Sequence, residues 1–336
     1  MHPKLQAWLL ALRPATLPIG VSPVVLGAGL AWAEGGWRPG ITALSLVTAL
    51  QLQLLSNLGN DYGDGRAGHD PPDRAGPPRA LALGRLTAAE LRRALGWLTG
   101  LTGATGLLLL NLALPRRGAA FVLFLLLGLL AVAAALGYMI GRRPYGHRTL
   151  GDLAVFLCFG LLGVLGTVYL NLQRLEPLHG LPAAACGLLA VAVLNINNLR
   201  DLERDRVAGK RTIAGLLGSR GARRYQWALV LGAGLLAALF LALRAASWPG
   251  WVCLLALPPL LGTTRRVVAA RRPADLNRPL RETVWRGLLF NLLLGVGAML
   301  AAMPPGEDSL HLTGYALMVA VDPPTTTGVA LCTSSF

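Results

Sequence analysis

The stretch NINNLRDLERDRVAGKRT, residues 195–212, decides the fold and directly follows an apolar run at 181–194. Within it Asn197, Asp201 and Asp205 recur every fourth residue, so on a helix they share one face and direct their oxygens into one small volume. The apolar run places this face where a membrane core meets water, and ionisable groups at that depth are costly and usually functional. The stretch therefore predicts a cation site at a membrane surface.

A second stretch of the same kind, NLGNDYGD at residues 57–64, lies in the first half of the chain. Asn57, Asp61 and Asp64 again share a helical face. Both stretches are followed by glycine and basic residues, a likeness that fits chance as well as it fits an internal repeat. Two such acidic faces, one in each half, predict a common ligand.

The composition excludes an ordinary soluble domain. Of 336 residues, 54% are hydrophobic and 14% are charged, whereas globular proteins carry about a quarter charged residues. The net charge of +15 lies in the gaps between apolar runs, which favours a role in membrane orientation over binding of nucleic acid. We therefore expect a lipid bilayer and no nucleic acid as partner.

The apolar runs predict an all-α polytopic bundle of about nine transmembrane helices around a central cavity. A span needs about 20 residues. The expected spans lie near 16–34, 41–60, 94–114, 119–140, 151–171, 181–199, 226–244, 247–263 and 284–303. Residues 1–303 are thus one membrane domain, and residues 304–336 are expected to be a poorly ordered tail. No removable signal peptide is expected, because Arg13 and Pro14 interrupt the first apolar run.

The loops predict the orientation, because Lys and Arg concentrate on the cytoplasmic side. Loops on one side carry 25 of these residues, and those on the other carry five, which are Arg38, Arg116, Arg117, Arg174 and Arg244. The N-terminus and both acidic stretches are then cytoplasmic, and the C-terminus is outside. This places the protein in the cytoplasmic (inner) membrane of a bacterium, with an active site that opens to the cytoplasm.

Carboxylate and amide oxygens without cysteine or histidine partners suit Mg²⁺. Mg²⁺ prefers one or two carboxylates together with phosphate oxygens, so the two acidic faces predict a phosphorylated ligand. Basic residues at the same helix ends fit that ligand. The expected diphosphate contacts are Asn60, Arg66, Arg142, Arg148, Asn198, Lys210 and Arg211.

Other residues receive structural interpretations. Tyr138 and Tyr145 are expected in the interfacial aromatic belt rather than in the cavity. Most of the 41 glycines are expected to let helices approach closely. The four cysteines lack metal-ligand spacing and are expected to be small core residues.

Five motifs resemble the UbiA superfamily of intramembrane aromatic prenyltransferases, and in particular its 1,4-dihydroxy-2-naphthoate polyprenyltransferase branch. They are LRPATLP at 12–18, SNLGNDYGD at 56–64, RPYG at 143–146, AVLNINNLRD at 192–201 and the GKRT that follows at 209–212. The likeness runs in order from about residue 8 to 303.

The resemblance implies nine helices around a cavity open to lipid, a polyprenyl diphosphate donor and Mg²⁺. It assigns the metal and diphosphate site to Asn57, Asp61, Asp64, Asn197, Asp201 and Asp205, with the four aspartates as catalytic residues. It further implies that the ring of 1,4-dihydroxy-2-naphthoate attacks the allylic cation and loses CO₂, giving demethylmenaquinone, in the pathway of menaquinone biosynthesis.

Two rival functions stay open. A sister enzyme of the same superfamily would prenylate another aromatic acceptor, such as 4-hydroxybenzoate or homogentisate. A cation-coupled transporter would also use intramembrane carboxylates. Both acidic faces, however, lie at one end of their helices, whereas a transport path needs polar groups across the whole membrane. Chain length of the donor and oligomeric state are not predicted.

Overall fold

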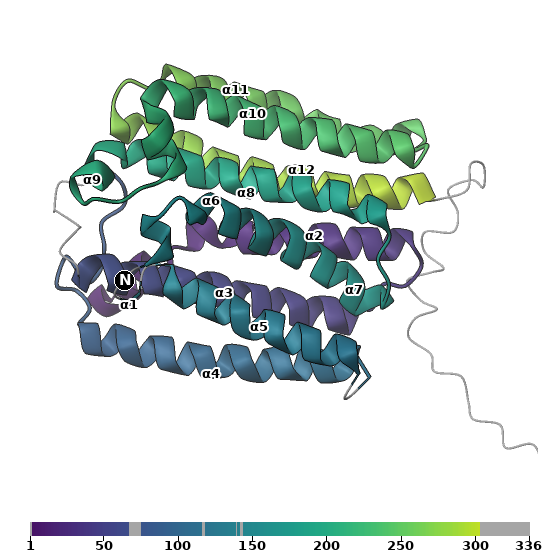
Figure 1. The fold of residues 1–336 in the computed structure, drawn as a ribbon, viewed down its shortest axis with the longest axis horizontal. Helices are drawn as coiled ribbons and strands as arrows, with labels where there is room; N and C mark the ends of the chain where they lie inside the picture. Colours follow the sequence, from purple (N-terminus) through teal and green to yellow (C-terminus); the bar gives the residue numbers. More distant parts are fainter. Residues whose placement is uncertain (1, 67–74, 116–117, 139, 142–143, 303–336) are drawn as a thin grey trace, which may run out of the picture. The chain divides into compact units, whose positions relative to one another are not determined.

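The computed structural model describes residues 2–66, 75–115, 118–138, 140–141 and 144–302. Regular structure in these ranges is entirely helical (Figure 1). The expected tail at 304–336 and the expected diphosphate contact Arg142 lie outside the described residues.

The nine predicted spans are confirmed as nine helical segments in the described part of the chain. Each is long and apolar enough to cross a bilayer, so this is a multi-pass membrane protein. The helices are α1 (Pro3–Leu12), α2 (Leu17–Ala33), α3 (Pro39–Arg66), α4 (Ala88–Ala113), α5 (Ala119–Gly137), α6 (Leu150–Val155), α7 (Gly166–Leu172), α8 (Gly180–Arg200), α9 (Leu202–Val207), α10 (Ile213–Leu243), α11 (Leu257–Ala269) and α12 (Asn277–Ala302). Segments of 3₁₀-helix lie between them: η1 (Pro14–Thr16), η2 (Tyr145–His147), η4 (Pro177–His179), η5 (Trp248–Ala256) and η6 (Pro273–Leu276). A π-helical segment, η3 (Phe156–Leu165), joins α6 to α7.

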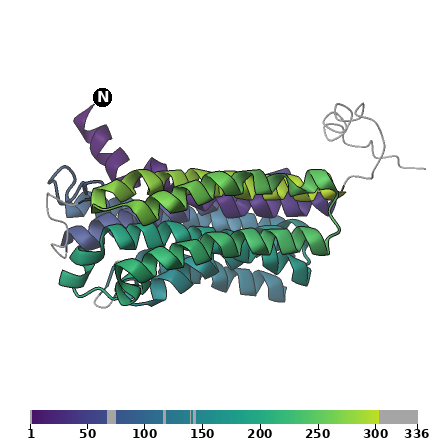
Figure 2. The same cartoon turned by 90° about the horizontal axis from the view of Figure 1, so that it is seen from above.

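The first span is broken near its start. Arg13 ends α1 in the left-handed region at φ 49°, and Pro14 opens η1, where its missing N–H is tolerated. Helix α1 consequently stands away from the common axis of the other helices (Figure 2). The first candidate span runs from Pro3 to Ala33 and contains this break, close to residue 16, where the sequence predicted the span to begin.

The first and last spans pack through glycines. A Cβ atom on Gly29 of α2 would lie 2.6 Å from Cα of Gly295 on α12, so only glycine permits this approach. Around this contact the largest core cluster joins α2, η3, α8, α10 and α12, with Phe240 and Phe290 fully buried. The predicted role of glycine in helix packing is confirmed here.

An ion-pair network ties helix ends together at the end of the bundle opposite the acidic stretches. Glu34 accepts a hydrogen bond from Arg244 Nη2 at 2.6 Å, contacts His179 Nε2 at 2.6 Å and lies 3.4 Å from Arg174. Arg244 also donates to Glu176 at 3.0 Å. The ligand atoms of Glu34, Glu176 and His179 lie within 4.8 Å of one another, but the Arg244 guanidinium already supplies their positive charge. The network thus joins the ends of α2 and α10 to the start of α8.

This network predicts a pH dependence of stability. Burial raises the pKa of Glu34, but hydrogen bonds and charges from Arg244 and His179 outweigh it, so the pKa falls below the ordinary value of 4.5. A carboxyl group whose pKa is lowered by folding stabilises the fold above pH 4.5. This stabilisation is lost as the pH falls through the pKa of the folded state. Thermal unfolding in detergent should therefore show a smaller acid-induced drop for Glu34→Gln than for the native chain. Equal drops would contradict this role of Glu34.

Candidate functional site

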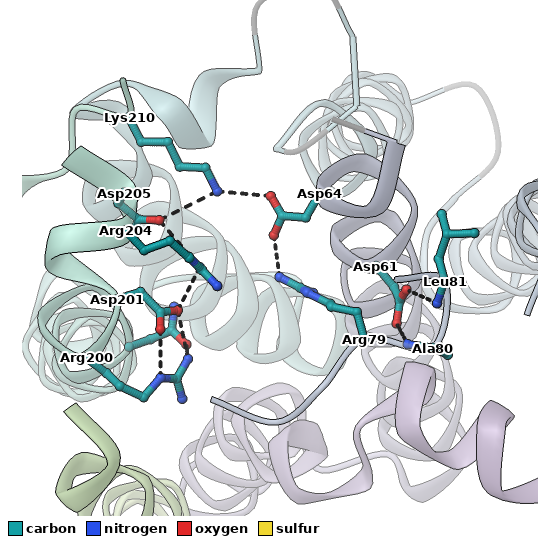
Figure 3. Close-up of polar contacts among 11 residues, drawn as sticks. Asp61, Asp64, Arg79, Ala80, Leu81, Arg200, Asp201, Arg204, Asp205 and Lys210 are labelled. Atoms are coloured by element: carbon teal, nitrogen blue, oxygen red, sulfur yellow. Dashed lines mark hydrogen bonds and ion pairs between the residues drawn. The ribbon is translucent and has the colours of Figure 1, made fainter. Parts of the chain in front are cut away.

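The two acidic stretches meet at one end of the bundle. Lys210, which follows α9, lies 3.0 Å from Oδ1 of Asp64 and 3.7 Å from Oδ1 of Asp205 (Figure 3). Asp64 lies in the last turn of α3, whereas Asp205 lies on α9, so residues more than a hundred positions apart share one ammonium group. All three side chains are nearly buried, at 3, 9 and 6% exposure for Asp64, Asp205 and Lys210.

Asp64 has a second cationic partner. Its Oδ2 accepts a short hydrogen bond from Nη2 of Arg79, whose side chain is also almost fully buried. Arg79 lies between α3 and α4, directly after Pro77 and Pro78, and Lys210 follows α9, so three separate parts of the chain meet at Asp64. Such buried, charge-assisted contacts are stronger than neutral ones and fix the carboxylate in place.

Asp201 is held by two arginines. Arg200 donates to both of its carboxylate oxygens, at 3.0 and 2.9 Å, and Arg204 Nη2 lies 3.0 Å from Oδ2. Arg200 also donates to Oδ1 of Asn197 at 2.7 Å and to Oδ1 of Asn277 on α12 at 3.2 Å. The second acidic face is therefore anchored to the last span.

Asp61 differs from the other predicted aspartates, because it faces backbone atoms rather than Lys210 and the second acidic stretch (Figure 3). Its two oxygens accept hydrogen bonds from the backbone N–H groups of Ala80 and Leu81, at 3.0 and 3.1 Å, and the residue is fully buried. It thereby fastens the segment that carries Arg79 against α3. In this arrangement Asp61 positions Arg79, while Asp64 faces the second acidic stretch.

Asn57 likewise faces a neighbouring segment. Its Nδ2 donates to the backbone oxygen of Leu12 at 2.8 Å and to Thr16 at 3.0 Å. These bonds fix the orientation of the amide, so that Oδ1 faces Gln53, whose Nε2 donates to it at 3.2 Å. Asn57 therefore links α3 to the break between α1 and α2.

The remaining predicted contacts fall into two groups. Asn60 lines the cavity described next, and its buried Oδ1 has no hydrogen-bond partner among the described residues, while Asn198 is buried on α8. Arg66, Arg148 and Arg211 are exposed at the same end of the bundle. Arg66 donates to the hydroxyl of Tyr62 at 3.2 Å rather than to an aspartate.

A mainly apolar cavity of about 490 Å³ lies between α2, α3, α4, α5, the α6–α7 span and α8. Its polar end includes Asn57, Asn60 and Asn197, and leucine, valine, alanine and phenylalanine line most of the rest. Tyr138 and Tyr145 line it with their rings edge to face, 5.3 Å apart, so the prediction that they lie in the aromatic belt was wrong. The sequence did not reveal this placement, because it depends on tertiary contacts: the Tyr145 hydroxyl donates to the backbone oxygen of Ala134 at 2.7 Å, and the N–H of Gly146 donates to that of Tyr138 at 3.0 Å.

The donors suit a hard divalent cation. The carboxylates of Asp64, Asp201 and Asp205 offer only oxygen, and the Lys210 ammonium already bridges two of them. Burial raises the pKa of Asp205, Lys210 opposes this rise, and the negative charge of Asp201 adds to it. A further cation nearby would stabilise the charged carboxylate, so these residues fit Mg²⁺.

Sequence reasoning missed several residues of this centre. Arg204 had a signal, because on a helix a residue three positions from Asp201 can reach its carboxylate. Arg200 had none, because adjacent residues on a helix do not normally face each other. Arg79 had no such signal, since it lies fifteen residues after Asp64 and outside α3. Asn277, whose Nδ2 binds the backbone oxygen of Ala75 at 2.7 Å, had none either.

Comparisons with known proteins identify the family. The profile of the UbiA prenyltransferase family matches residues 21–293. The 1,4-dihydroxy-2-naphthoate octaprenyltransferase of Escherichia coli (strain K12) is 46% identical over 296 residues, which cover 88% of this chain and 96% of that protein.

Solved structures share the fold. A UbiA homolog from Aeropyrum pernix K1 in its apo form has a TM-score of 0.63 at 18% identity, over 84% of this chain and 96% of that one. A UbiA homolog from Archaeoglobus fulgidus bound to DMAPP and Mg²⁺ has a TM-score of 0.60 at 16% identity, over 87% and 98%. The match of the family profile to most of the sequence, together with the high identity to a full-length relative, shows that this chain belongs to the UbiA prenyltransferase family.

Proposed function

We propose that this protein transfers a polyprenyl group from polyprenyl diphosphate to 1,4-dihydroxy-2-naphthoate, with release of diphosphate and CO₂. The observation that carries the proposal is the Asp64–Lys210–Asp205 bridge, which joins the two acidic stretches. Asn57, Asn60 and Asn197, which belong to the same stretches, line the apolar cavity. The name of the Escherichia coli relative supports the choice of acceptor.

Different residues of the site would bind the diphosphate and the prenyl group of the polyprenyl diphosphate. Lys210 and Arg79 lie where the diphosphate would bind and can neutralise the charge that develops on the leaving oxygen. The apolar cavity receives the prenyl group and keeps water from the allylic cation. The rings of Tyr138 and Tyr145 line that cavity and can stabilise a cation through their π faces.

Asp64, Asp201 and Asp205 would hold Mg²⁺, and the bound ion would supply electrostatic stabilisation of the departing diphosphate. Asn197 is linked to Asp201 by Arg200, which donates to both side chains. Asp61 would position Arg79, and Asn57 would position the start of α2. The C–O bond breaks with its electron pair on diphosphate, and the ring carbon supplies the pair for the new C–C bond. The pair of the lost carboxylate returns to the ring, so the product leaves at the hydroquinone level.

The membrane orientation belongs to the same proposal. The excess of Lys and Arg at the end that carries the acidic stretches supports a cytoplasmic opening of the site in a bacterial inner membrane. The same geometry disfavours the transporter alternative, because the buried aspartates gather at this one end and the cavity beyond them is lined mainly by apolar side chains.

An acceptor competition tests the proposal. Purified protein in detergent with octaprenyl diphosphate and Mg²⁺ should prenylate 1,4-dihydroxy-2-naphthoate and release labelled CO₂ from its carboxyl group. It should prefer this acceptor over 4-hydroxybenzoate and homogentisate, and chelation of Mg²⁺ should stop turnover. Preference for 4-hydroxybenzoate or homogentisate would show instead that the protein prenylates that acceptor. Turnover that survives chelation would refute the metal assignment.

A further inference from the structure

Among the described residues that line the cavity, Gln53 carries a hydrogen-bond acceptor without a partner. It lies on α3 and is only 7% exposed. Its Oε1 is buried and receives no hydrogen bond from the part of the chain that the structure describes. Buried polar groups are almost always paired, and leaving an acceptor unpaired costs stability, so this oxygen indicates a ligand.

The bonds of Asn57 fix which atom of the Gln53 amide is left over. Asn57 Nδ2 donates to the backbone oxygen of Leu12 at 2.8 Å and to Thr16 Oγ1 at 3.0 Å, so Asn57 offers Gln53 only its Oδ1. Gln53 meets that oxygen with Nε2, at 3.2 Å, and Oε1 remains. A Cβ atom at Gly20 would lie 3.2 Å from Cβ of Gln53, so α2 packs against the base of this side chain. The last torsion of a glutamine is soft, so a small turn of the amide can bring Oε1 to a ligand in the cavity.

The chemistry of this oxygen defines its ligand. A carbonyl oxygen accepts hydrogen bonds and cannot donate them, so the ligand must offer an N–H or O–H group. In the proposed reaction the prenyl chain has no such group, and the diphosphate is ionised at neutral pH. The donors that remain are the two ring hydroxyls of the naphthoate. The 1-hydroxyl lies beside the carboxylate and can donate to it within the molecule, whereas the 4-hydroxyl has no such neighbour.

The position of Gln53 along α3 separates this contact from the metal site. Gln53 precedes Asp64 by eleven residues, so about 16 Å of helix lies between them. Bonds from Mg²⁺ to oxygen are about 2.0–2.1 Å long, so the two residues cannot share an ion. Ser45 also lines the cavity with an unpaired, buried oxygen, but a hydroxyl both donates and accepts and therefore does not define its ligand.

We propose that Gln53 binds the 4-hydroxyl of 1,4-dihydroxy-2-naphthoate and thereby positions the ring of the acceptor in the cavity. The inference rests on the proposed prenyl transfer and adds a residue that selects the acceptor. The hydroxyl donates to Oε1, and the ring lies against the apolar side chains of the cavity wall. An acid that lacks this hydroxyl leaves the oxygen unpaired and binds more weakly.

Binding of two acids tests this contact. In detergent, without oxygen and without donor, the native protein should bind 1,4-dihydroxy-2-naphthoate at least about tenfold more tightly than 1-hydroxy-2-naphthoate, which lacks the 4-hydroxyl. Gln53→Met keeps about the size of the side chain but removes the carbonyl oxygen, so this preference should fall to about twofold or less. Gln53→Leu should give the same loss. The KM for octaprenyl diphosphate should stay within about twofold of the native value in both variants, because the contact involves the acceptor alone.

Gln51→Met is the matched control. Gln51 lies on the same helix and is 8% exposed, but it does not line the cavity. Its Oε1 already accepts a hydrogen bond from Oγ1 of Thr105 on α4, at 2.6 Å. Gln51→Met should therefore keep the native preference between the two acids.

Three results would overturn the contact: equal binding of the two acids by the native protein, an unchanged preference in the Gln53 variants, or an equal loss of preference in Gln51→Met. Prenylation of the naphthoate by the native protein, together with any of these, would leave the proposed function in place. Failure of the native protein to prenylate the naphthoate would instead refute the proposed function, and the contact with it.

Discussion

Asp64→Asn is expected to reduce prenyl transfer by at least about 100-fold, the scale seen when one preorganised electrostatic contact is removed from an active site. The substitution keeps the size of the side chain but removes the negative charge that Arg79 and Lys210 share. Its main effect should fall on kcat, because both cations stay available to bind the diphosphate. Initial rates over a range of Mg²⁺ concentrations would measure it, and the Mg²⁺ requirement should rise.

Glu203→Gln is the control for this change. Glu203 lies on α9 between Asp201 and Asp205, but it is exposed, whereas those two aspartates are buried. Glu203→Gln should retain native turnover, although it removes one carboxylate charge, as Asp64→Asn does. Native turnover in Asp64→Asn, or an equal loss in Glu203→Gln, would show that the bridge between the two acidic stretches is not the reaction centre.

Arg200→Met should produce the largest loss of stability. The substitution leaves the buried carboxylate of Asp201 with a weaker set of partners and removes the bonds to Asn197 and Asn277. Breaking a buried ion pair from one side costs about 3–5 kcal/mol, and the remaining contact from Arg204 places the expected cost near the lower figure. The midpoint of thermal unfolding in detergent should fall accordingly.

Arg206→Met provides the comparison for Arg200→Met. Arg206 is exposed on α9, so its loss should change stability by no more than about 0.5 kcal/mol. If both variants unfold at the native temperature, the contacts of Arg200 contribute little to the fold. Activity of each variant, measured below its unfolding temperature, would separate a structural loss from a direct effect on the site.

The sequence predicted the spans and the convergence of the two stretches for different reasons. Apolar runs of bilayer length leave few alternatives to a helix, because backbone groups in lipid must bond within their own segment. The spacing of Asp201 and Asp205 predicted a shared side of the chain, and both do lie near one another around Arg204. The position of a residue along a helix does not, however, reveal which residues of other helices or loops contact it.

The contacts that were not predicted depend on tertiary neighbours. The helical pattern grouped Asp61 with Asp64, but the segment at 79–81 brings two backbone N–H groups to Asp61 and a guanidinium to Asp64. Glycine has the same sequence signal at Gly29 and Gly106, although one lies in a tight contact and the other beside open space. Composition cannot separate these two uses.

The built-in cations of the site have a consequence for handling the protein. Lys210, Arg79 and Arg200 balance the buried aspartates from within the chain, so the carboxylates do not need an external ion to avoid mutual repulsion. A zinc finger unfolds when its metal is removed, whereas this protein should stay folded, but inactive, after exhaustive dialysis against a chelator. Restoring magnesium should then revive it without a refolding step.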